Sequence, residues 1–296
     1  MWWIFLTLGA ITFQTMRNLE QRKLVKKIDP LTASWARFIL PFPLSIIVIF
    51  FTLNNFSYNL SKFILVNSIF QMLGSIFLVK AMQYRNYSIA ITLGKTETIQ
   101  ALFVGLLFYN IKITPIEIIF IFIAFIGVIL MSEIKFNKNK LNPVTNPANF
   151  FGIFSATCFA ITSFNLKNAC DVLIELGYNN IIAATLVLLY TIFWQNIFFI
   201  AIKFKQKTLK NSIKSLISSD NINSFLIASS LSFIGSIFWY SAYSYGEVIH
   251  VKMVGQLEII IALIISCFFL KERHSIKNFI GIFLVLFSIL VIIIKQ

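Results

Sequence analysis

The chain is poor in charged residues, in cysteine and in histidine. Only 12% of its 296 residues are Asp, Glu, Lys or Arg, whereas an ordinary soluble domain has about 25%. Its three cysteines, Cys158, Cys170 and Cys267, are odd in number and widely spaced, which fits neither a disulfide framework nor a metal site. The sequence also lacks a nucleophile motif, a His/Asp/Glu cluster and paired aspartates in its apolar runs. We therefore expect no catalytic residues and no bound metal.

Long polar stretches are missing as well, so no sizeable soluble domain is expected. Hydrophobic residues make up 58% of the chain, and the mean hydropathy is +0.84, values typical of a polytopic membrane protein. The net charge of +14 would suggest nucleic acid in a soluble protein. Here Lys and Arg crowd the loops between apolar runs, where they face the cytoplasm and anionic lipid. The expected environment is the lipid bilayer, with no nucleic-acid partner.

Apolar runs separated by short polar breaks predict an all-α membrane protein with about ten transmembrane helices. A bilayer core requires about 20 apolar residues per helix, and an open sheet would leave its edges unsatisfied in lipid. We expect the first run to be a retained span rather than a cleaved signal peptide, and Pro41 and Pro43 to kink the second span. The expected spans lie near Trp2–Asn18, Leu31–Leu53, Lys62–Tyr84, Tyr87–Tyr109, Thr114–Glu133, Phe150–Lys167, Asn180–Ile202, Ser224–Tyr245, Val248–Leu270 and Ile276–Ile294.

The two halves of the chain repeat each other. Glu97 lies near the middle of an apolar run, flanked by Gly94 and Ala101, and a glutamate recurs at Glu258 with Gly and Ala at the same offsets. Because each half holds an odd number of spans, the second half must enter the membrane in the opposite orientation. Inverted repeats of this kind are common in transporters, with the binding site near the midplane. We predict two inverted five-helix repeats, residues 1–135 and 150–296, joined by a linker at 136–149.

Two short motifs point to a known family. The second span begins DPLT at 29–32 and continues ARF at 36–38, and the ninth ends FLKER at 269–273. These residues resemble motifs of the EamA family of the drug/metabolite transporter (DMT) superfamily, and the resemblance covers nearly the whole chain. It implies a carrier without a bound cofactor that opens alternately to the two sides of the membrane. The family often has Pro in the fourth and ninth spans, where this chain has Lys95 and Gln256 or residues nearby.

Charged residues in the middle of a span are the strongest candidates for function. Each costs roughly 3 kcal/mol to insert at that depth, so it marks a functional site by default. We expect Glu97 and Glu258 beside a central cavity, where one or both exchange a proton or pair with a cationic group of the substrate. The alternative is that each Glu bonds a neighbouring helix and never touches substrate. Lys95 points about 200° away from Glu97 around the helix, and its three open roles are an anion contact, snorkelling to the interface, or pairing with another carboxylate.

Other polar and aromatic residues in apolar spans complete the predicted substrate-binding set: Gln14, Arg37, Gln71, Trp239 and Tyr243. Arg37 could snorkel or meet a substrate anion, whereas the glutamines could equally serve as interhelical glue. The two aromatic residues could line a cavity for planar or cationic ligands or simply pack. Lys252, close to the start of the ninth span, is expected to snorkel to the membrane surface.

The leading functional prediction is a secondary transporter that moves a small polar metabolite, an amino acid or related compound, across the inner membrane by alternating access. The alternatives are transport of a nucleotide-like metabolite, an intramembrane enzyme, and a non-transporting membrane scaffold. The sequence leaves open whether transport is coupled to protons and whether two copies form a homodimer. The loops after odd-numbered spans, Arg17 included, are the basic ones. That pattern places both termini outside, whereas the family resemblance implies cytoplasmic termini.

Overall fold

The computed structural model of the protein describes residues 1–52, 57–84, 94, 96–131, 147–261 and 276–294, and the secondary structure of this described part is helical. Its helices are α1 (Trp2–Val25), α2 (Pro30–Ile39), α3 (Phe42–Thr52), α4 (Tyr58–Tyr84), α6 (Glu97–Phe108), α7 (Pro115–Met131), α8 (Pro147–Glu175), α9 (Asn180–Lys205), α10 (Leu209–Leu216), α11 (Ile222–Tyr245), α12 (Val248–Gly255) and α14 (Ile276–Ile294).

By length and composition, α4, α8, α9 and α11 can each cross a membrane, and the bent pair α2 and α3 makes a fifth candidate if it counts as one span. Three shorter apolar helices, Glu97–Phe108, Pro115–Gly127 and Phe279–Ile294, accompany them. The all-helical membrane architecture is therefore confirmed. The count of ten spans is not confirmed by the described residues, and the linker at 136–149 lies mostly outside them.

The second predicted span is bent where the sequence indicated. Asp29 caps the start of α2, since its side chain accepts a hydrogen bond from the Thr32 backbone N–H at 3.0 Å, and Pro30 occupies the first turn. Helix α2 ends before Pro41, and α3 continues at an angle of 54° to it. Proline removes a backbone donor and clashes with the preceding turn, so the predicted kink is confirmed.

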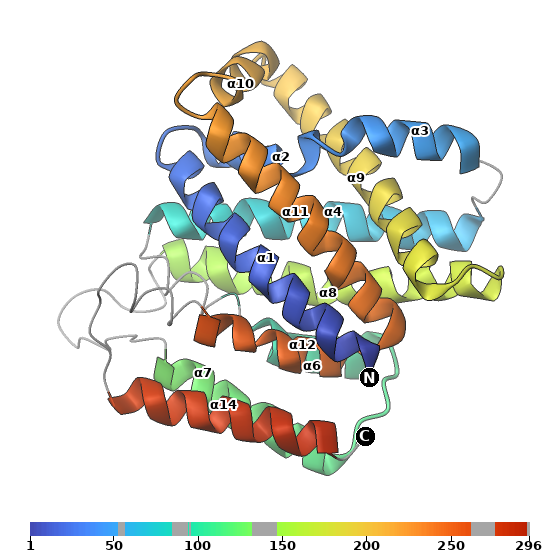
Figure 1. Ribbon diagram of the computed structural model, residues 1–296, viewed down its shortest axis with the longest axis vertical. Helices are drawn as coiled ribbons and strands as arrows, with labels where there is room; N and C mark the ends of the chain where they lie inside the picture. The colour runs from blue at the N-terminus through green and yellow to red at the C-terminus, as the bar shows by residue number, and fades with distance from the viewer. Residues whose placement is uncertain (53–56, 85–93, 95, 132–146, 262–275, 295–296) are drawn as a thin grey trace.

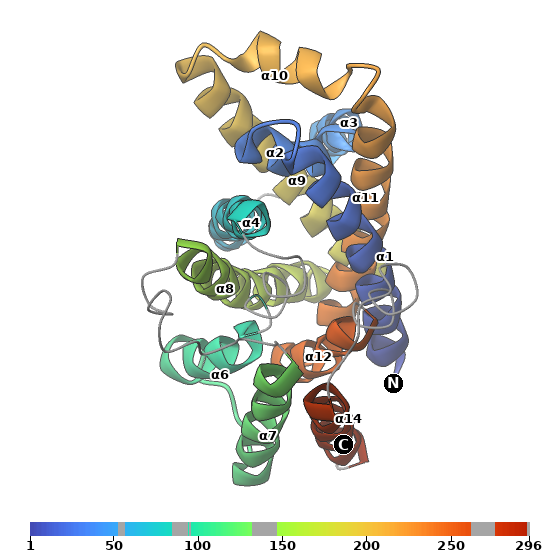
Figure 2. The same cartoon turned by 90° about the vertical axis from the view of Figure 1, so that its left-hand side faces the viewer.

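The helix pairs with the most extensive contacts join the two halves of the chain. Helix α1 lies along α11, α4 along α8, and α7 along α14. Figure 2 shows α4 nearly end-on with α8 beside it, and α7 and α14 together at the edge of the molecule. Each of these pairs joins a first-half helix to a second-half helix, so a space between them is bounded by both halves.

We call the end of the molecule formed by the α1–α2 connection and helix α10 the basic end. There the Lys203 Nζ atom lies 3.1 Å from Asp29 Oδ1, and Lys27 donates a hydrogen bond to the Asp220 carbonyl. Buried apolar residues pack beneath these contacts: Leu24, Val25, Ala33, Ala36, Val79, Leu216, Phe225 and Ala228. In the described residues the basic end is therefore closed by side-chain packing.

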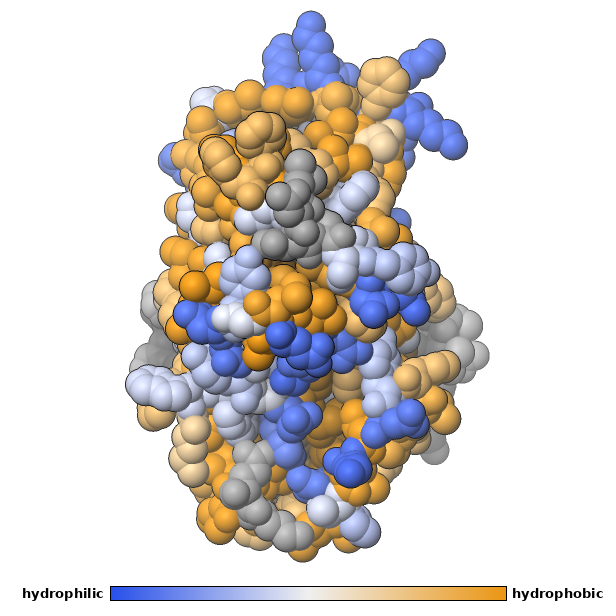
Figure 3. Space-filling view, turned by 90° about the vertical axis from the view of Figure 1, so that its right-hand side faces the viewer, coloured by the Kyte–Doolittle hydropathy of each residue, from blue (hydrophilic) through white to orange (hydrophobic). Residues whose placement is uncertain are grey.

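The opposite end carries both chain termini, the 109–114 segment and the turn between α11 and α12, and we call it the terminal end (Figure 1). Figure 3 looks onto this end: polar side chains gather in its middle, and apolar side chains cover its flanks. Apolar flanks around a polar centre are the arrangement expected of a bundle that contacts lipid at its sides and water at its end.

Candidate functional site

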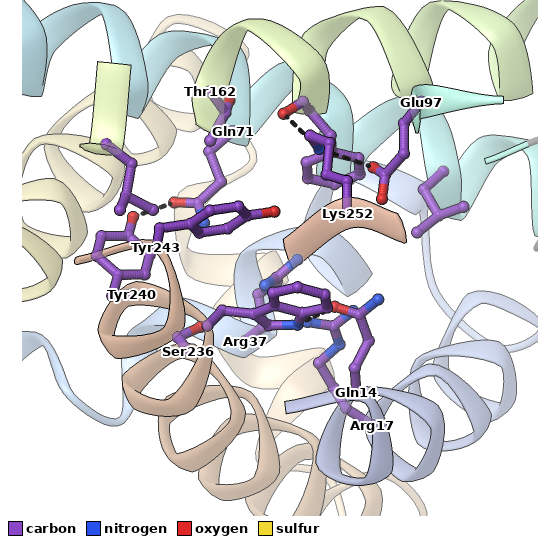
Figure 4. Close-up of a pocket in the computed structure, with 14 residues that line it drawn as sticks. Gln14, Arg17, Arg37, Gln71, Glu97, Thr162, Ser236, Tyr240, Tyr243 and Lys252 are labelled. Atoms are coloured by element: carbon purple, nitrogen blue, oxygen red, sulfur yellow. Dashed lines mark hydrogen bonds and ion pairs between the residues drawn. The ribbon is translucent and has the colours of Figure 1, made fainter. Parts of the chain in front are cut away.

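A central cavity of about 80 Å³ lies between the two halves of the chain. Its walls come from α1, α2, α4 and α6 of the first half and from α8, α11 and α12 of the second (Figure 4). The polar and aromatic side chains that line it are Gln14, Arg17, Arg37, Gln71, Glu97, Phe159, Thr162, Ser236, Trp239, Tyr240, Tyr243 and Lys252.

Each of the two repeated glutamates follows a break in a helix. Glu97 is the first residue of α6, directly after the turn residue Thr96. On the other side, Gln256 interrupts the helix at the end of α12, and Glu258 stands in the helical stretch that resumes at 257–261. A negative side chain is favourable at a helix N-terminus. Broken helices whose ends face the binding site are also typical of secondary transporters.

Glu258 is fixed by amide donors from the other half of the chain. Its side chain is 1% exposed, and its two carboxylate oxygens accept hydrogen bonds from Gln14 Nε2 at 2.7 Å and from Asn18 Nδ2 at 3.0 Å. The Asn18 Oδ1 atom in turn accepts from the Arg17 guanidinium at 2.7 Å. The same two amides, with Gly94 and Glu97, line a smaller cavity of about 30 Å³ beside Glu258. Glu258 therefore joins α1 to the second half of the chain.

Glu97 has a different environment, because its recorded polar partner is a lysine. The Lys252 Nζ atom lies 3.7 Å from Glu97 Oε2, and it also donates to the Phe159 carbonyl at 3.4 Å. Lys252 is only 2% exposed and points into the central cavity (Figure 4). The expectation that Lys252 would snorkel to the membrane surface is therefore wrong: the ion pair and the carbonyl hold its ammonium group in the cavity wall.

Arg37 is a buried cation on the opposite wall. It is 4% exposed, its Nε donates to Ser232 Oγ at 3.0 Å, and its guanidinium lies 4.8 Å from the centre of the Phe38 ring. A second, longer contact of 3.4 Å reaches the Ser75 hydroxyl. These partners are neutral, and no carboxylate pairs with Arg37 among the described residues. Of the two open roles for Arg37, snorkelling does not fit this burial.

Aromatic side chains of α11 form the third wall. The rings of Trp239 and Tyr243 stack with their centres 5.7 Å apart, and the Trp239 indole N–H donates to Gln14 Oε1 at 2.9 Å. The Tyr240 hydroxyl donates to Gln71 Oε1 at 3.0 Å. The Cβ atom of any larger residue at Gly255 would lie 2.9 Å from the Trp239 ring, so only glycine lets α12 approach α11 this closely.

A comparison of the sequence with models of protein families identifies the family of this chain. The model of the EamA-like transporter family matches residues 1–133 and 146–294, almost the whole chain in two stretches. The chain belongs to the EamA-like transporter family. This EamA protein is therefore a multi-pass membrane transporter of the drug/metabolite transporter superfamily, built from two repeats, in a family whose members are transporters and not enzymes.

A solved crystal structure has a fold similar to that of this EamA transporter. The two superpose with a TM-score of 0.68 over 97% of this chain and 94% of the other, at 11% sequence identity. A likeness at that identity supports the fold alone. A search of curated proteins finds no match to the sequence.

The structure of this EamA transporter gathers most of the residues predicted for its binding site. Six of them line the central cavity: Gln14, Arg37, Gln71, Glu97, Trp239 and Tyr243. Glu258 lines the smaller adjoining cavity, and Lys95 lies outside the described residues. Their roles in binding stay predictions.

The sequence analysis missed two cations of the EamA transporter's cavity, Arg17 and Lys252. Arg17 lies at the very end of the predicted first span, Trp2–Asn18, where its charge groups it with the basic loop that follows, whereas α1 continues to Val25. A usable signal was present, because Arg17 follows Gln14 by three residues and so shares its helix face.

Proposed function

We propose that this EamA transporter is a secondary carrier for a small polar metabolite that bears both a carboxylate and an amine, such as an amino acid or a related compound. The observation that supports this choice best is the buried Arg37 guanidinium, whose recorded partners are neutral, on the wall of a cavity that also holds Glu97. The two side chains offer one site for an anion and one for a cation.

The carboxylate of such a substrate would bind Arg37. A buried charge without a counter-ion costs several kcal/mol, and a guanidinium can bind a carboxylate with two parallel hydrogen bonds. A substrate carboxylate bound to Arg37 would therefore offset the cost of burying this charge. The amine would bind Glu97 in place of Lys252, whose 3.7 Å separation from that carboxylate is longer than a good charged hydrogen bond.

The remaining part of the substrate would contact the stacked Trp239 and Tyr243 rings. Thr162 offers a further polar group, because its buried Oγ1 atom lines the cavity without a hydrogen-bond partner in the described part of the chain. A threonine hydroxyl can both donate and accept, so it suits either end of a dipolar ligand.

The size of the cavity supports alternating access. At about 80 Å³ the space is well below the roughly 300 Å³ of a small ligand site, so substrate binding requires the halves to move apart. We infer that the two repeats are inverted, hold ten spans in total, and rock about the cavity to open it to one side of the inner membrane at a time.

A nucleotide-like metabolite is the second candidate. Among the described lining residues, Arg17, Arg37 and Lys252 carry positive charge and Glu97 alone carries negative charge. That excess and the stacked aromatic pair would suit a planar anion. The rate of nucleotide uptake relative to amino-acid uptake distinguishes this candidate from the first.

The test is uptake into proteoliposomes by the purified protein. Radiolabelled amino acids and nucleotides are each supplied singly, with the Arg37→Met, Glu97→Gln and Lys62→Met variants alongside the wild type. Lys62 is an exposed lysine at the start of α4, outside the cavity, and serves as the matched control. We expect amino-acid flux in the wild type and in Lys62→Met, and a loss of about tenfold or more in the two cavity variants. Absence of flux with every compound would favour the scaffold alternative.

A further inference from the structure

A second cavity, larger than the central one, opens at the terminal end. Its volume is about 640 Å³, within the usual range of roughly 300–1,000 Å³ for small-ligand sites. Three segments build it: residues 109–113, one face of α8, and the first turn of α12 with the residue before it. It shares no lining residue with the central cavity, so it is a separate site.

Helix α8 forms a wall of both cavities. Thr162 and Leu166, four residues apart, line the central cavity, whereas Phe164, Lys167 and Asp171 line the terminal one. The two sets lie on different faces of a single helix, since residues three, four and seven apart share a face. The two cavities are therefore separated by one helix.

The walls of the terminal cavity are held in place by local contacts. The Tyr109 and Phe164 rings stack with centres 4.6 Å apart, and Asn165 donates a hydrogen bond to the Tyr109 hydroxyl at 2.7 Å. Asn110 has a φ of 47°, a left-handed conformation that asparagine tolerates better than most residues. It turns the chain so that the Ile111 N–H bonds the Gly105 carbonyl at 3.3 Å. The 109–113 segment is thus a fixed wall rather than a loose loop.

Most of the ionisable side chains around this cavity already have partners. Lys167 Nζ lies 3.1 Å from Asp171 Oδ1, and His250 Nε2 lies 2.9 Å from Glu117 Oε1. Lys112 and Glu247 differ, because neither side chain has a hydrogen bond or an ion pair with another described residue. Within the described part of the chain, the cavity therefore presents one unpaired cationic side chain, Lys112, and one unpaired anionic side chain, Glu247, to a ligand.

The N-terminus of α12 adds to the cationic character of one wall. The backbone N–H groups of Val248 and Ile249 belong to the first helical turn and have no intrahelical acceptor, and the Glu247 side chain does not cap them. Both residues line the cavity. Such N–H groups favour an anionic group of a ligand, so they support the carboxylate end of a dipolar molecule.

We propose that the terminal cavity is a second substrate-binding site, in which a zwitterionic metabolite places its carboxylate on Lys112 and the α12 N-terminus and its ammonium group on Glu247. The site holds the same class of compound as the central cavity and so rests on the proposed function. Its role is to bind the substrate at the terminal end, either before the substrate moves past α8 into the central cavity or after it has left that cavity.

The test counts bound molecules on the full-length protein in lipid nanodiscs. Radiolabelled L-amino acids, supplied singly, are titrated onto wild type, the Lys112→Met/Glu247→Gln double variant, and Glu97→Gln. Lys112 and Glu247 are both exposed, so their replacement leaves the core packing intact. The matched control is Lys62→Met/Glu175→Gln, which removes one exposed charge of each sign from helix ends that do not line the cavity.

We expect two molecules bound per chain in wild type and in the control, and one in the terminal-cavity variant and in Glu97→Gln. In proteoliposomes the terminal-cavity variant should raise KM about tenfold, since charged contacts are lost, with kcat within twofold of wild type. One site in wild type, or a KM that the double variant leaves unchanged, overturns this inference and leaves the proposed function standing. No binding in wild type refutes the proposed function and this inference with it.

Discussion

The hydrogen bonds around Glu258 have a fixed direction, and this direction predicts how Glu258→Gln changes stability. The Trp239 indole N–H donates to the Gln14 oxygen, and the Gln14 amide N–H₂ donates to Glu258. From the other side the Arg17 guanidinium donates to the Asn18 oxygen, and the Asn18 amide N–H₂ donates to Glu258. Indole and guanidinium groups are donors only, so neither amide can turn around without leaving a buried donor unpaired.

Glu258→Gln therefore cannot be accommodated in this network. Glutamine has one acceptor oxygen and a donor N–H₂ group, so one of the two amide donors must face another donor. A buried donor left unsatisfied costs about 1–3 kcal/mol, and we expect the free energy of unfolding to fall by about 2 kcal/mol. For a chain of this size the melting temperature should drop by roughly 3 °C. Thermal unfolding of the detergent-purified protein, followed by intrinsic fluorescence, measures it.

Trp239→Phe supplies the control, because it removes the donor that holds Gln14 in its orientation. In that background Gln14 can turn and present its oxygen to the new amide at position 258, so Glu258→Gln should cost less. The double-mutant cycle should give a coupling energy of about 1 kcal/mol or more. If the two substitutions are additive, or if Glu258→Gln alone leaves stability unchanged, the fixed direction of the network is wrong.

Three further outcomes are expected. Burial raises the pKa of Asp29, but hydrogen bonds from Thr32 and Lys203 outweigh it and hold the pKa below its ordinary value of 3.8. The stability that Asp29 contributes is therefore complete above about pH 4 and is lost as the pH falls through the lowered pKa. In a plot of melting temperature against pH, Asp29→Asn should reduce the fall of the melting temperature at acid pH. Gly255→Ala should lower the free energy of unfolding by about 1–3 kcal/mol in the same assay, because its Cβ overlaps an indole ring. Glu97→Gln should abolish any response of transport to a pH gradient across proteoliposomes; an unchanged response would exclude Glu97 as the proton carrier.

The membrane class, the paired halves and several helix boundaries could be predicted from the sequence. Asp29-Pro30 starts a helix and Pro41 ends one because capping and the missing proline donor act within a few residues along the chain. Glu97 and Glu258 stood out as midspan charges for an equally local reason, since an apolar run around a carboxylate is visible in any window of the sequence. The short motifs at 29–32, 36–38 and 269–273 also resemble those of the EamA family, and the match to the family model confirmed that resemblance.

The bonding of these residues was decided by tertiary structure alone. Two glutamates at equivalent repeat positions have unlike partners, amides for Glu258 and the Lys252 ammonium for Glu97. Those partners belong to the opposite half of the chain, and no periodicity within one helix predicts which face of a distant helix it will meet. Lys252 illustrates the reason. Its position near the start of a predicted span indicated that its ammonium group would reach water, whereas the packing of α12 against α8 and α6 buries it. Sequence determines what each helix can offer, and the arrangement of helices determines which of those groups meet.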